Sequence, residues 1–491
     1  MRFVAASLPS RRVIPALLAI LATALIFVLS ISTYRDRPFQ PVRQHDIPDL
    51  NQVSVVGQEL AHSPIRPPYK DTFGELGRRC RILRDWLLAA EQTSDKVVQT
   101  ALNAAVEQIA LAEFPFLTNS PRHAESHTPI ADLRASYIPG TAGIVISCGE
   151  KTARFAAHLI TTLRNVLNSK LPIRIVYAGD KDLSPKTRER LAGFGTHGYL
   201  SPIEFLDITS VFDDSLLQLR TGGWAIKSFA ALAVEFEQVI MLDADAVFLQ
   251  SPEALLSHSA FVSTGALLFH DRLIWPHAFP ERHAWWRDQI RHPSAAMNKS
   301  RAWTEDYAEE ADSGVVVLNK GRIDVLIGLL HVCWQNSLSV REEVTYKLTY
   351  GDKESWWLGL ELAGATYEFE KHYGAIVGWE ENDDQGKDKV CSIYIAHVDE
   401  KDQLLWYNGG LLRDKNDKLG THASYEVPQT WMVDAEWQKS PVRGAPSCMV
   451  GGEAHRLTER ETQILADSID WAKKADKIMT IQKDEHQGAA A

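Results

Sequence analysis

Apolar runs and stretches of helical periodicity alternate in the middle of the chain. Three apolar runs rich in branched residues predict strands, at residues 143–148, 173–178 and 203–206. The stretches between them, 152–168 and 184–193, have the apolar spacing of helices. Strand and helix alternating in this way indicate a parallel sheet with right-handed crossovers. We therefore expect an α/β domain over residues 140–425.

The same pattern recurs around two acidic residues. An apolar-faced helix expected at 224–237, with Lys227 in its first turns, leads into a buried strand at 239–242. Asp243 and Asp245 follow that strand at once. Ligands in open α/β sheets lie at the carboxyl ends of strands, and paired carboxylates there suit Mg²⁺ or Mn²⁺. A helix cap or a solvated turn is the alternative for the two acids, and an exposed helix lysine is the alternative for Lys227.

Three later stretches also combine polar residues with an element boundary. In the stretch 312–319, Asp312 comes just before an expected strand. Asp352 opens a helix expected within 351–362, and His397 ends a strand expected at 393–397. Each has a structural alternative, because such residues also serve as turn residues, helix caps or hydrogen-bonded histidines. Trp356 and Trp357 are expected in the core. For Trp275, Trp406, Tyr407 and Asn408, sugar contact and core packing are both open.

The flanks of this domain divide the chain further. Residues 13–31 contain no charged residue and are long enough to span a bilayer, and Arg2, Arg11 and Arg12 precede them. We expect a retained signal anchor rather than a cleaved signal peptide. The predicted divisions are a cytosolic tail (1–12), the anchor (13–31), a proline-rich stem (32–70), a helical region (71–139), the catalytic domain (140–425) and a C-terminal accessory region (426–491).

Smaller predictions concern segments within these divisions. Residues 74–113 have the spacing of two helices, with a cap expected at Ser94, and residues 118–140 look loop-like. Residues 265–310 have few strand signals and are expected to form an insertion in the α/β domain. A helix with Leu465 and Ile469 on one face is expected in the tail.

Charge and cysteine content narrow the classes of function. The 491 residues carry a net charge of −11, which argues against a nucleic-acid polymer as partner. The five cysteines include no C-x-x-C pair, so no zinc ribbon or redox motif is indicated. One or two disulfides could form in an oxidising lumen. No glycine-rich dinucleotide fingerprint and no P-loop is present in the sequence.

Several motifs in a fixed order resemble one family. WAIKSFA, VIMLDADAVFLQ, DSGVVVLNKGR, GDKESWWLG and HVDEKDQLLWYNGG follow one another between residues 224 and 410. Together with the anchor, this series resembles the fungal Golgi α-1,3-mannosyltransferases of glycosyltransferase family 71, over roughly residues 140–415. The family is similar in layout to glycogenin-like transferases, and this similarity implies a GT-A-type fold, a Rossmann-like sheet flanked by helices.

The resemblance also implies roles for single residues. Asp243, Asp245 and His397 match the positions that hold Mn²⁺, and Asp243 and Lys227 match positions at the donor's diphosphate. Ser147, at the end of the first strand, is expected near the nucleoside. Asp312 and Asp352 match acids near the reacting sugar. The implied reaction is transfer of mannose from GDP-mannose to a mannose-containing glycan with retention of configuration.

Several alternatives stay open at this point. A covalent intermediate and front-face attack are both compatible with two neighbouring carboxylates. A UDP-sugar-dependent glycogenin-like transferase and a non-catalytic subunit of a mannosyltransferase complex are rival functions. The expected location is the Golgi membrane, in a single-pass type II orientation with the catalytic domain in the lumen. Whether the chain forms a homo- or hetero-oligomer is open.

Overall fold

The computed structural model describes residues 49–118, 121, 126–194, 201–381, 388–413, 425–440 and 445–480. Residues 47–491 form one compact unit. The predicted tail (1–12) and anchor (13–31) lie outside the described residues. Within the described part, no single helix is long and apolar enough to cross a membrane. One bent pair, Ile323–Gln335 with Leu338–Leu348, passes that test jointly at a 61° bend.

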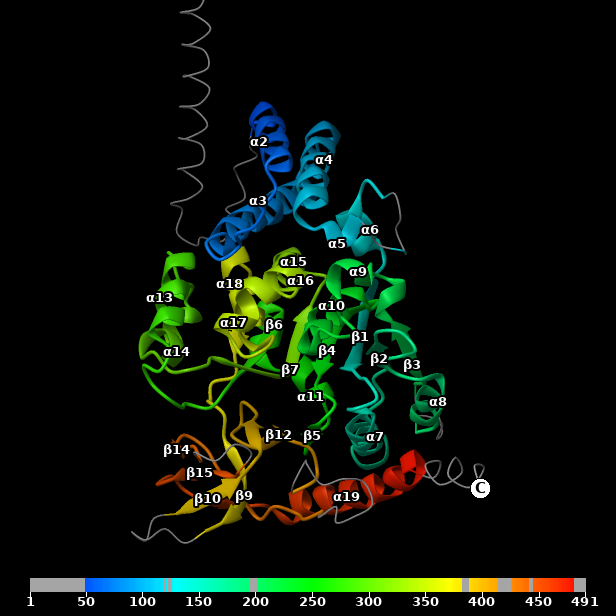
Figure 1. The fold of residues 1–491 in the computed structure, drawn as a ribbon, viewed down its shortest axis with the longest axis vertical. Coiled ribbons are helices and arrows are strands. Elements are labelled where there is room, and N and C mark those ends of the chain that lie inside the picture. The colour runs from blue at the N-terminus through cyan, green and yellow to red at the C-terminus, as the bar shows by residue number, and fades with distance from the viewer. Residues whose placement is uncertain are drawn as a thin grey trace, which may run out of the picture. The chain divides into compact units, whose positions relative to one another are not determined.

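A seven-stranded sheet lies at the centre, in the order β3-β2-β1-β4-β7-β6-β8 (Figure 1). Its strands are β1 (Ile138–Ser147), β2 (Ile173–Tyr177), β3 (Ile203–Asp207), β4 (Phe236–Leu242), β6 (Ala266–His270), β7 (Ala311–Asn319) and β8 (Glu368–Phe369). β3, β2, β1 and β4 are parallel, and β7 runs antiparallel to β4 and β6. The predicted α/β class with a mainly parallel sheet is confirmed. β7 therefore begins at the edge where β4 and β6 end.

Helices surround this sheet and continue at both ends of the unit. The longer helices are α2 (Leu50–His62), α3 (Phe73–Gln92), α4 (Lys96–Glu113), α6 (Pro129–Ala135), α7 (Ala153–Thr161), α8 (Pro185–Gly193), α10 (Ile226–Ala233), α13 (Pro280–Gln289), α15 (Ile323–Gln335), α18 (Lys353–Ala363) and α19 (Glu459–Thr480). The shorter ones are α5 (Pro115–Thr118), α9 (Asp214–Leu217), α11 (Glu253–Leu256), α12 (Ser259–Thr264), α14 (Arg301–Thr304), α16 (Leu338–Val340) and α17 (Tyr346–Leu348).

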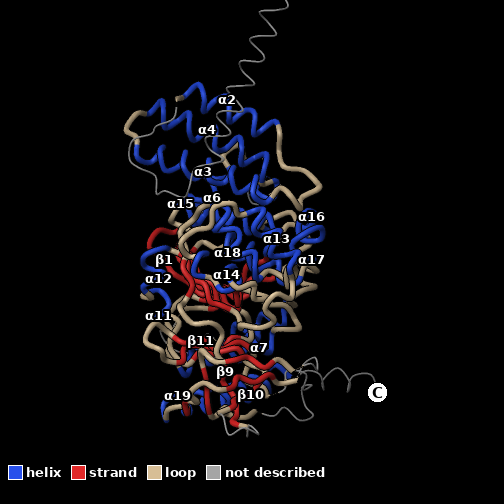
Figure 2. The backbone as a smooth tube through the Cα atoms, turned by 90° about the vertical axis from the view of Figure 1, so that its left-hand side faces the viewer, coloured by secondary structure: helices blue, strands red, loops and turns tan. Residues whose placement is uncertain are grey.

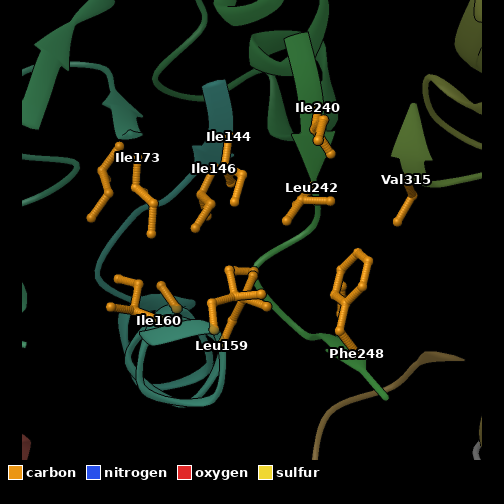
Figure 3. Close-up of a cluster of buried hydrophobic side chains, with 14 of the residues drawn as sticks. Ile144, Ile146, Leu159, Ile160, Ile173, Ile240, Leu242, Phe248 and Val315 are labelled. Atoms are coloured by element: carbon orange, nitrogen blue, oxygen red, sulfur yellow. The ribbon is translucent and has the colours of Figure 1, made fainter. Parts of the chain in front are cut away.

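One face of the sheet packs on α7. Side chains of a strand alternate between faces, so Ile144 and Ile146 of β1 point the same way as Ile240 and Leu242 of β4. Figure 3 shows these side chains together with Leu159 and Ile160 of α7, and all belong to one buried cluster. This packing fixes the carboxyl ends of β1 and β4 against α7.

α10, α15 and α18 pack on strands of the same sheet, and α3 packs on α15 and α18. The contact between α3 and α18 is close: a Cβ on Gly77 would lie 2.7 Å from the Leu362 side chain. A larger residue at 77 would therefore push the two helices apart. Figure 2 shows α2, α3 and α4 side by side. Of the two helices predicted within residues 74–113, α3 thus packs on the α/β domain, whereas α4 packs on α2, α3 and α6.

Two smaller antiparallel sheets follow the main one. Their strands are β5 (Ala246–Phe248), β9 (Ile376–Glu380), β10 (Lys389–Ser392), β11 (Ile395–Val398), β12 (Leu404–Asn408), β13 (Thr430–Met432), β14 (Glu436–Gln438), β15 (Ser447–Val450) and β16 (His455–Arg456). β11, β12 and β5 form a three-stranded sheet, and the other six form the second. A disulfide joins Cys391 to Cys448 across paired β10 and β15, while Cys80, Cys148 and Cys333 are buried thiols. In the tail, α19 packs on α7 with Leu465 and Ile469 buried, as predicted.

Several predicted elements differ in the structure. The stem predicted for 32–70 contains α2, and the loop predicted for 118–140 contains α6 and the start of β1. The predicted 224–237 helix ends at Ala233, because the β-favouring run that begins at Phe236 extends β4. Asp95, not Ser94, caps α4, through hydrogen bonds from Val97 N (2.8 Å) and Val98 N (3.3 Å) to its carboxylate.

The largest difference lies in residues 265–310. The sequence predicted an insertion there, but β6 is an internal strand of the main sheet. Its five residues are all buried. The run was too short to be distinguished from a loop by periodicity, and its partner β7 lies more than forty residues later. Long-range pairing, not local pattern, makes this segment a strand.

Candidate active site

The acidic turn after β4 is held by backbone contacts from two other strands. Asp243 N donates to Gly314 O of β7 at 2.8 Å. The carbonyl of Asp245 accepts from Gly409 N at 3.2 Å and from Gly410 N at 2.7 Å, just after β12. Both aspartates are partly exposed, although Ala244 between them is buried. The turn is therefore fixed, and its two acids lie at the carboxyl end of a buried strand, as the sequence predicts.

Lys227 of α10 is buried beneath this turn. Its Nζ lies 3.0 Å from Asp243 Oδ1, 3.1 Å from Asp352 Oδ2 and 2.9 Å from Ser313 Oγ. Burial alone would lower the pKa of Lys227, but the charges of Asp243 and Asp352 outweigh it and raise that pKa. The alternative of an exposed helix lysine is wrong, because Lys227 is only 3% exposed. Its predicted contact with the donor's diphosphate stays a prediction.

Asp352 faces this lysine rather than capping its own helix. No hydrogen bond joins its side chain to the backbone at the start of α18. Instead Trp356 Nε1 donates to Asp352 Oδ2 at 2.8 Å, and Ser313 Oγ donates to Oδ1 at 3.3 Å. The structure therefore brings Asp352 together with Lys227 and Asp243, and rules out helix capping as the role of its carboxylate.

Charge at the turn is unbalanced. Burial raises the pKa of Asp243; the Lys227 charge opposes this, and the charges of Asp245 and Asp352 add to it. The turn and its surroundings thus hold three carboxylates and one ammonium, which contacts Asp243 and Asp352. An excess of negative charge on oxygen atoms is what a hard divalent cation requires. Asp243 and Asp245 fit Mn²⁺ on this ground, and the ion itself stays a prediction.

Asp312 and His397 form a second, fully buried pair at the same edge. His397 Nε2 lies 3.1 Å from Asp312 Oδ2, and Gly314 N donates to Oδ1 at 2.9 Å. Burial would raise the pKa of Asp312, but the hydrogen bond and charge of His397 outweigh burial, so this pKa is lowered. The His397 ring stacks on Trp406 at a centroid distance of 4.3 Å. The side chains of Asp312 and His397 are each 1% exposed.

This pairing bears on the predicted set of metal ligands. Among the described residues, the one set of three ligand groups within 4.8 Å of one another is Glu381, Cys391 and Cys448, whose cysteines form the disulfide. The predicted set of Asp243, Asp245 and His397 does not meet this criterion. Ligation through His397 Nε2 would require exchange of its contact with Asp312.

Ser147 lies at the carboxyl end of β1, the edge at which nucleotides bind in open α/β sheets. Its hydroxyl oxygen is buried and has no hydrogen-bond partner within the described ranges. Buried hydroxyls are nearly always paired. An unpaired one at this edge fits the predicted contact with a ligand, which stays a prediction.

Sequence reasoning missed a charged group at the end of β6. Lys353, at the start of α18, forms ion pairs with Asp271 and with Glu309, the latter at 3.3 Å. Arg272 Nε lies 3.1 Å from Asp271 Oδ1. Burial would raise the pKa of Asp271, but the neighbouring cations lower it strongly. The apolar run before Asp271 repeats the pattern before Asp243, which was the available signal.

The aromatic residues with two open interpretations separate clearly. Trp406 and Tyr407 are core residues at 0% and 1% exposure, as are the predicted core residues Trp356 and Trp357 at 1% each. Trp275 is 50% exposed. Asn408 lies in the site, where its Nδ2 donates to Asp312 Oδ1 at 3.3 Å. Of these residues, only Trp275 and Asn408 remain candidates for sugar contact.

Comparison with known proteins adds to this geometry. A family model described as "Mannosyltransferase putative" matches residues 141–399. That span holds the predicted metal, donor and catalytic residues together with Lys353 and Asp271. The chain belongs to this mannosyltransferase family. The matched span of the mannosyltransferase family ends two residues after His397, so Asn408 and the rest of β12 lie beyond it.

Curated relatives come from yeasts. Alpha-1,3-mannosyltransferase MNT3 of Saccharomyces cerevisiae is 28% identical over 301 residues, 55% of this chain and 46% of that protein. Alpha-1,3-mannosyltransferase MNN1 of the same yeast is 24% identical over 348 residues, 60% of this chain and 43% of that protein. The chain spans about half the length of these mannosyltransferases.

Among solved structures, the galactosyltransferase LgtC is 16% identical, with a TM-score of 0.31 over 46% of this chain and 73% of LgtC. The mannosyltransferase Ktr4p of S. cerevisiae is 10% identical, with a TM-score of 0.27 over 70% of this chain and 83% of Ktr4p. The overlap of backbones is partial in both cases.

Proposed function

We propose that this protein is a Mn²⁺-dependent, retaining glycosyltransferase with a GT-A-type fold that moves mannose from GDP-mannose to a mannose-containing glycan, through an α-1,3 linkage. One observation carries the proposal: Asp243 and Asp352 both contact the buried Lys227 at the carboxyl end of β4, and the charge of Asp245 acts on Asp243 at the same turn. Membership in the mannosyltransferase family supports the choice of mannose as the transferred sugar.

The chemistry requires charge control at the departing diphosphate. Asp243 and Asp245 would hold the cation, which supplies Lewis-acid stabilisation of the leaving group when bound. Lys227 supplies the countercharge to Asp243 and Asp352, because its ammonium lies within 3.1 Å of both carboxylates. A fixed countercharge of this kind costs no reorganisation during the reaction.

Asp312 and Asp352 are the carboxylates for the sugar side of the site. Negative charge near a pyranose ring stabilises the positive charge that develops at its anomeric carbon. Both acids are held in place, Asp312 by His397 and Asp352 by Trp356. A covalent intermediate needs one of them to reach the anomeric carbon, whereas front-face attack needs only their field. Both routes are compatible with this arrangement.

The compartment follows from the same proposal. A donor-dependent mannosyltransferase anchored through residues 13–31 would act in the Golgi lumen as a type II protein. The disulfide between Cys391 and Cys448 supports an oxidising compartment.

A donor and acceptor screen tests the proposal. The full chain would be incubated with GDP-mannose, UDP-glucose or UDP-galactose and with methyl α-D-mannopyranoside, each with EDTA and after Mn²⁺ is restored. We expect mannose transfer from GDP-mannose alone, lost in EDTA and recovered with Mn²⁺. Turnover of a UDP-sugar but not of GDP-mannose would contradict the donor. No turnover by folded protein would favour a non-catalytic subunit.

A further inference from the structure

We propose that Trp224 and Tyr350 form an aromatic platform that binds a pyranose ring of the acceptor glycan. This inference rests on the proposed function, because it names the surface on which that reaction's acceptor lies. The two rings are neighbours, with centroids 5.4 Å apart at an interplanar angle of 49°. They come from segments more than 120 residues apart in the chain.

Each ring of the platform lies within three residues, along the chain, of a charged residue of the site. Trp224 is in the short turn Gly223–Ala225, which leads into α10 and precedes Lys227 by three residues. Tyr350 precedes Asp352, the residue before α18, by two residues. Lys227 and Asp352 are themselves in contact, at 3.1 Å. The two rings are therefore attached to the same two segments that supply Lys227 and Asp352 to the site.

Exposure sets these rings apart from the other large aromatics of the site. Trp224 is 46% exposed and Tyr350 is 60% exposed, whereas Trp356 and Trp406 are at most 1% exposed. Single exposed apolar residues are common on any protein, but two in contact at the edge of a charged site are not explained by packing. Their free faces are available to a ligand.

The rings are held by the backbone around them. Gly351 has φ +67°, and a Cβ there would lie 2.8 Å from the Trp224 ring. The indole therefore packs directly on the backbone at Gly351. The loop before Trp224 is anchored by the buried Arg341, which donates to Leu217 O at 2.7 Å and to Gln218 O at 3.3 Å. A platform fixed in this way loses little conformational entropy when a ligand binds.

The surrounding chemistry favours a saccharide as the occupant. Aromatic faces carry negative charge density, which attracts the slightly positive C–H groups on one face of a pyranose ring. Lys353 Nζ lies 5.9 Å from the Tyr350 ring centroid and is paired with Asp271 and Glu309. Apolar faces rimmed by carboxylates and an ammonium match a ligand that has both C–H faces and many hydroxyls.

The test separates acceptor binding from catalysis in four forms of the full chain: wild type, Trp224→Ala, Trp224→Phe and the control Trp471→Ala. Trp471 is a partly exposed tryptophan on α19, a helix that packs on α7 and α8. Binding of an α-linked mannobiose would be measured calorimetrically without donor, and binding of GDP with Mn²⁺ separately. The acceptor KM and kcat would be measured with GDP-mannose.

We expect Trp224→Ala to weaken mannobiose binding and raise the acceptor KM by about tenfold, the loss of one aromatic stack. GDP binding and kcat should stay within about twofold, Trp224→Phe should keep most of the binding, and Trp471→Ala should match wild type. A purely structural role would instead lower kcat and GDP binding together and leave mannobiose binding unchanged.

Two outcomes overturn the platform: mannobiose binding that is equal in wild type and Trp224→Ala, or no mannobiose binding by wild type. If transfer from GDP-mannose persists in either case, the proposed function stands without the platform. If wild type binds mannobiose through Trp224 but transfers nothing from any donor, the platform stands and the proposed function fails.

Discussion

Two lysines are buried at opposite ends of β4, and their surroundings differ completely. At the carboxyl end, Lys227 contacts Asp243 and Asp352. At the other end, Lys320 donates to the carbonyl of Val234 at 2.6 Å and lies 3.7 Å from the centroid of the Tyr137 ring. No carboxylate forms an ion pair with Lys320 within the described ranges. Two lysines near opposite ends of one strand thus have different electrostatic environments.

The pKa values differ in the same way. Burial lowers the pKa of Lys320 well below its usual range, and Glu235 opposes this only weakly. For Lys227, two aspartates reverse the effect of burial and raise the pKa. Burying an ammonium is costly unless it is paired. The pairing at one end marks where the protein concentrates charge for chemistry, and the neutral environment at the other end marks structural packing.

Of the changes that test this comparison, removal of Lys227 is expected to have the largest effect on stability and activity. Lys227→Met leaves the buried Asp352 and the partly exposed Asp243 without a countercharge, and we expect the free energy of unfolding to fall by about 3–5 kcal/mol. Transfer from GDP-mannose should fall at least about a hundredfold. Chemical denaturation and initial rates would measure both quantities. Retention of wild-type rate in Lys227→Met would contradict the assigned role.

Lys320→Met is the matched control and a smaller perturbation. Methionine fills nearly the same volume, so at pH 10 we expect stability to change by less than about 1.5 kcal/mol. The transfer rate should stay near that of wild type, because Lys320 lies at the opposite end of β4. A loss of activity as large as that of Lys227→Met, without unfolding, would mean that charge at both ends of the strand matters.

The pH dependence of stability gives the most specific effect. The folded-state pKa of Lys320 is lowered, so below about pH 10.4 the unfolded chain binds a proton that the folded chain does not. Stability of wild type relative to Lys320→Met should therefore rise with pH up to that value, by at most about 1.4 kcal/mol per unit. Urea denaturation between pH 7 and 10 would measure it.

Lys227 should behave in the opposite way. Its folded-state pKa is raised, so its stabilisation is complete below about pH 10.4 and is lost only at higher pH. The difference between wild type and Lys227→Met should stay constant from pH 8 to 10. A difference that grows with pH in this range would show that Lys227 is not ionised in the folded protein.

Local sequence pattern was enough for the strands that border the turn. β1 and β4 each contain a short apolar run near their carboxyl ends, β2 is apolar except for Arg174, and the acids after β4 stand out because they end such a run. The convergence of Asp352 on Lys227 could be suspected only from the resemblance, since 125 residues separate them. Their contact depends on how α18 packs against β7, which no local pattern reports.

The pairing of His397 with Asp312 shows the limit of prediction from local sequence pattern. The family resemblance implied that His397 is a metal ligand, which stays a prediction, and β11 belongs to a separate antiparallel sheet. The register of β11 with β12 sets His397 opposite Trp406, and the ring then meets Asp312. β6 was missed for a related reason, because its neighbours β7 and β8 are distant in the chain. Sheet order and register are properties of the whole fold.

The most direct measurement concerns Asp245 and the cation. Mn²⁺ binding in the presence of GDP would be followed by electron paramagnetic resonance in the full chain and in Asp245→Asn, alongside transfer from GDP-mannose. We expect wild type to bind Mn²⁺ and to transfer mannose only when it is present. Asp245→Asn should lose both by about a hundredfold or more while its unfolding temperature stays unchanged. Wild-type Mn²⁺ binding and transfer in Asp245→Asn would contradict the assignment of the acidic turn as the metal site.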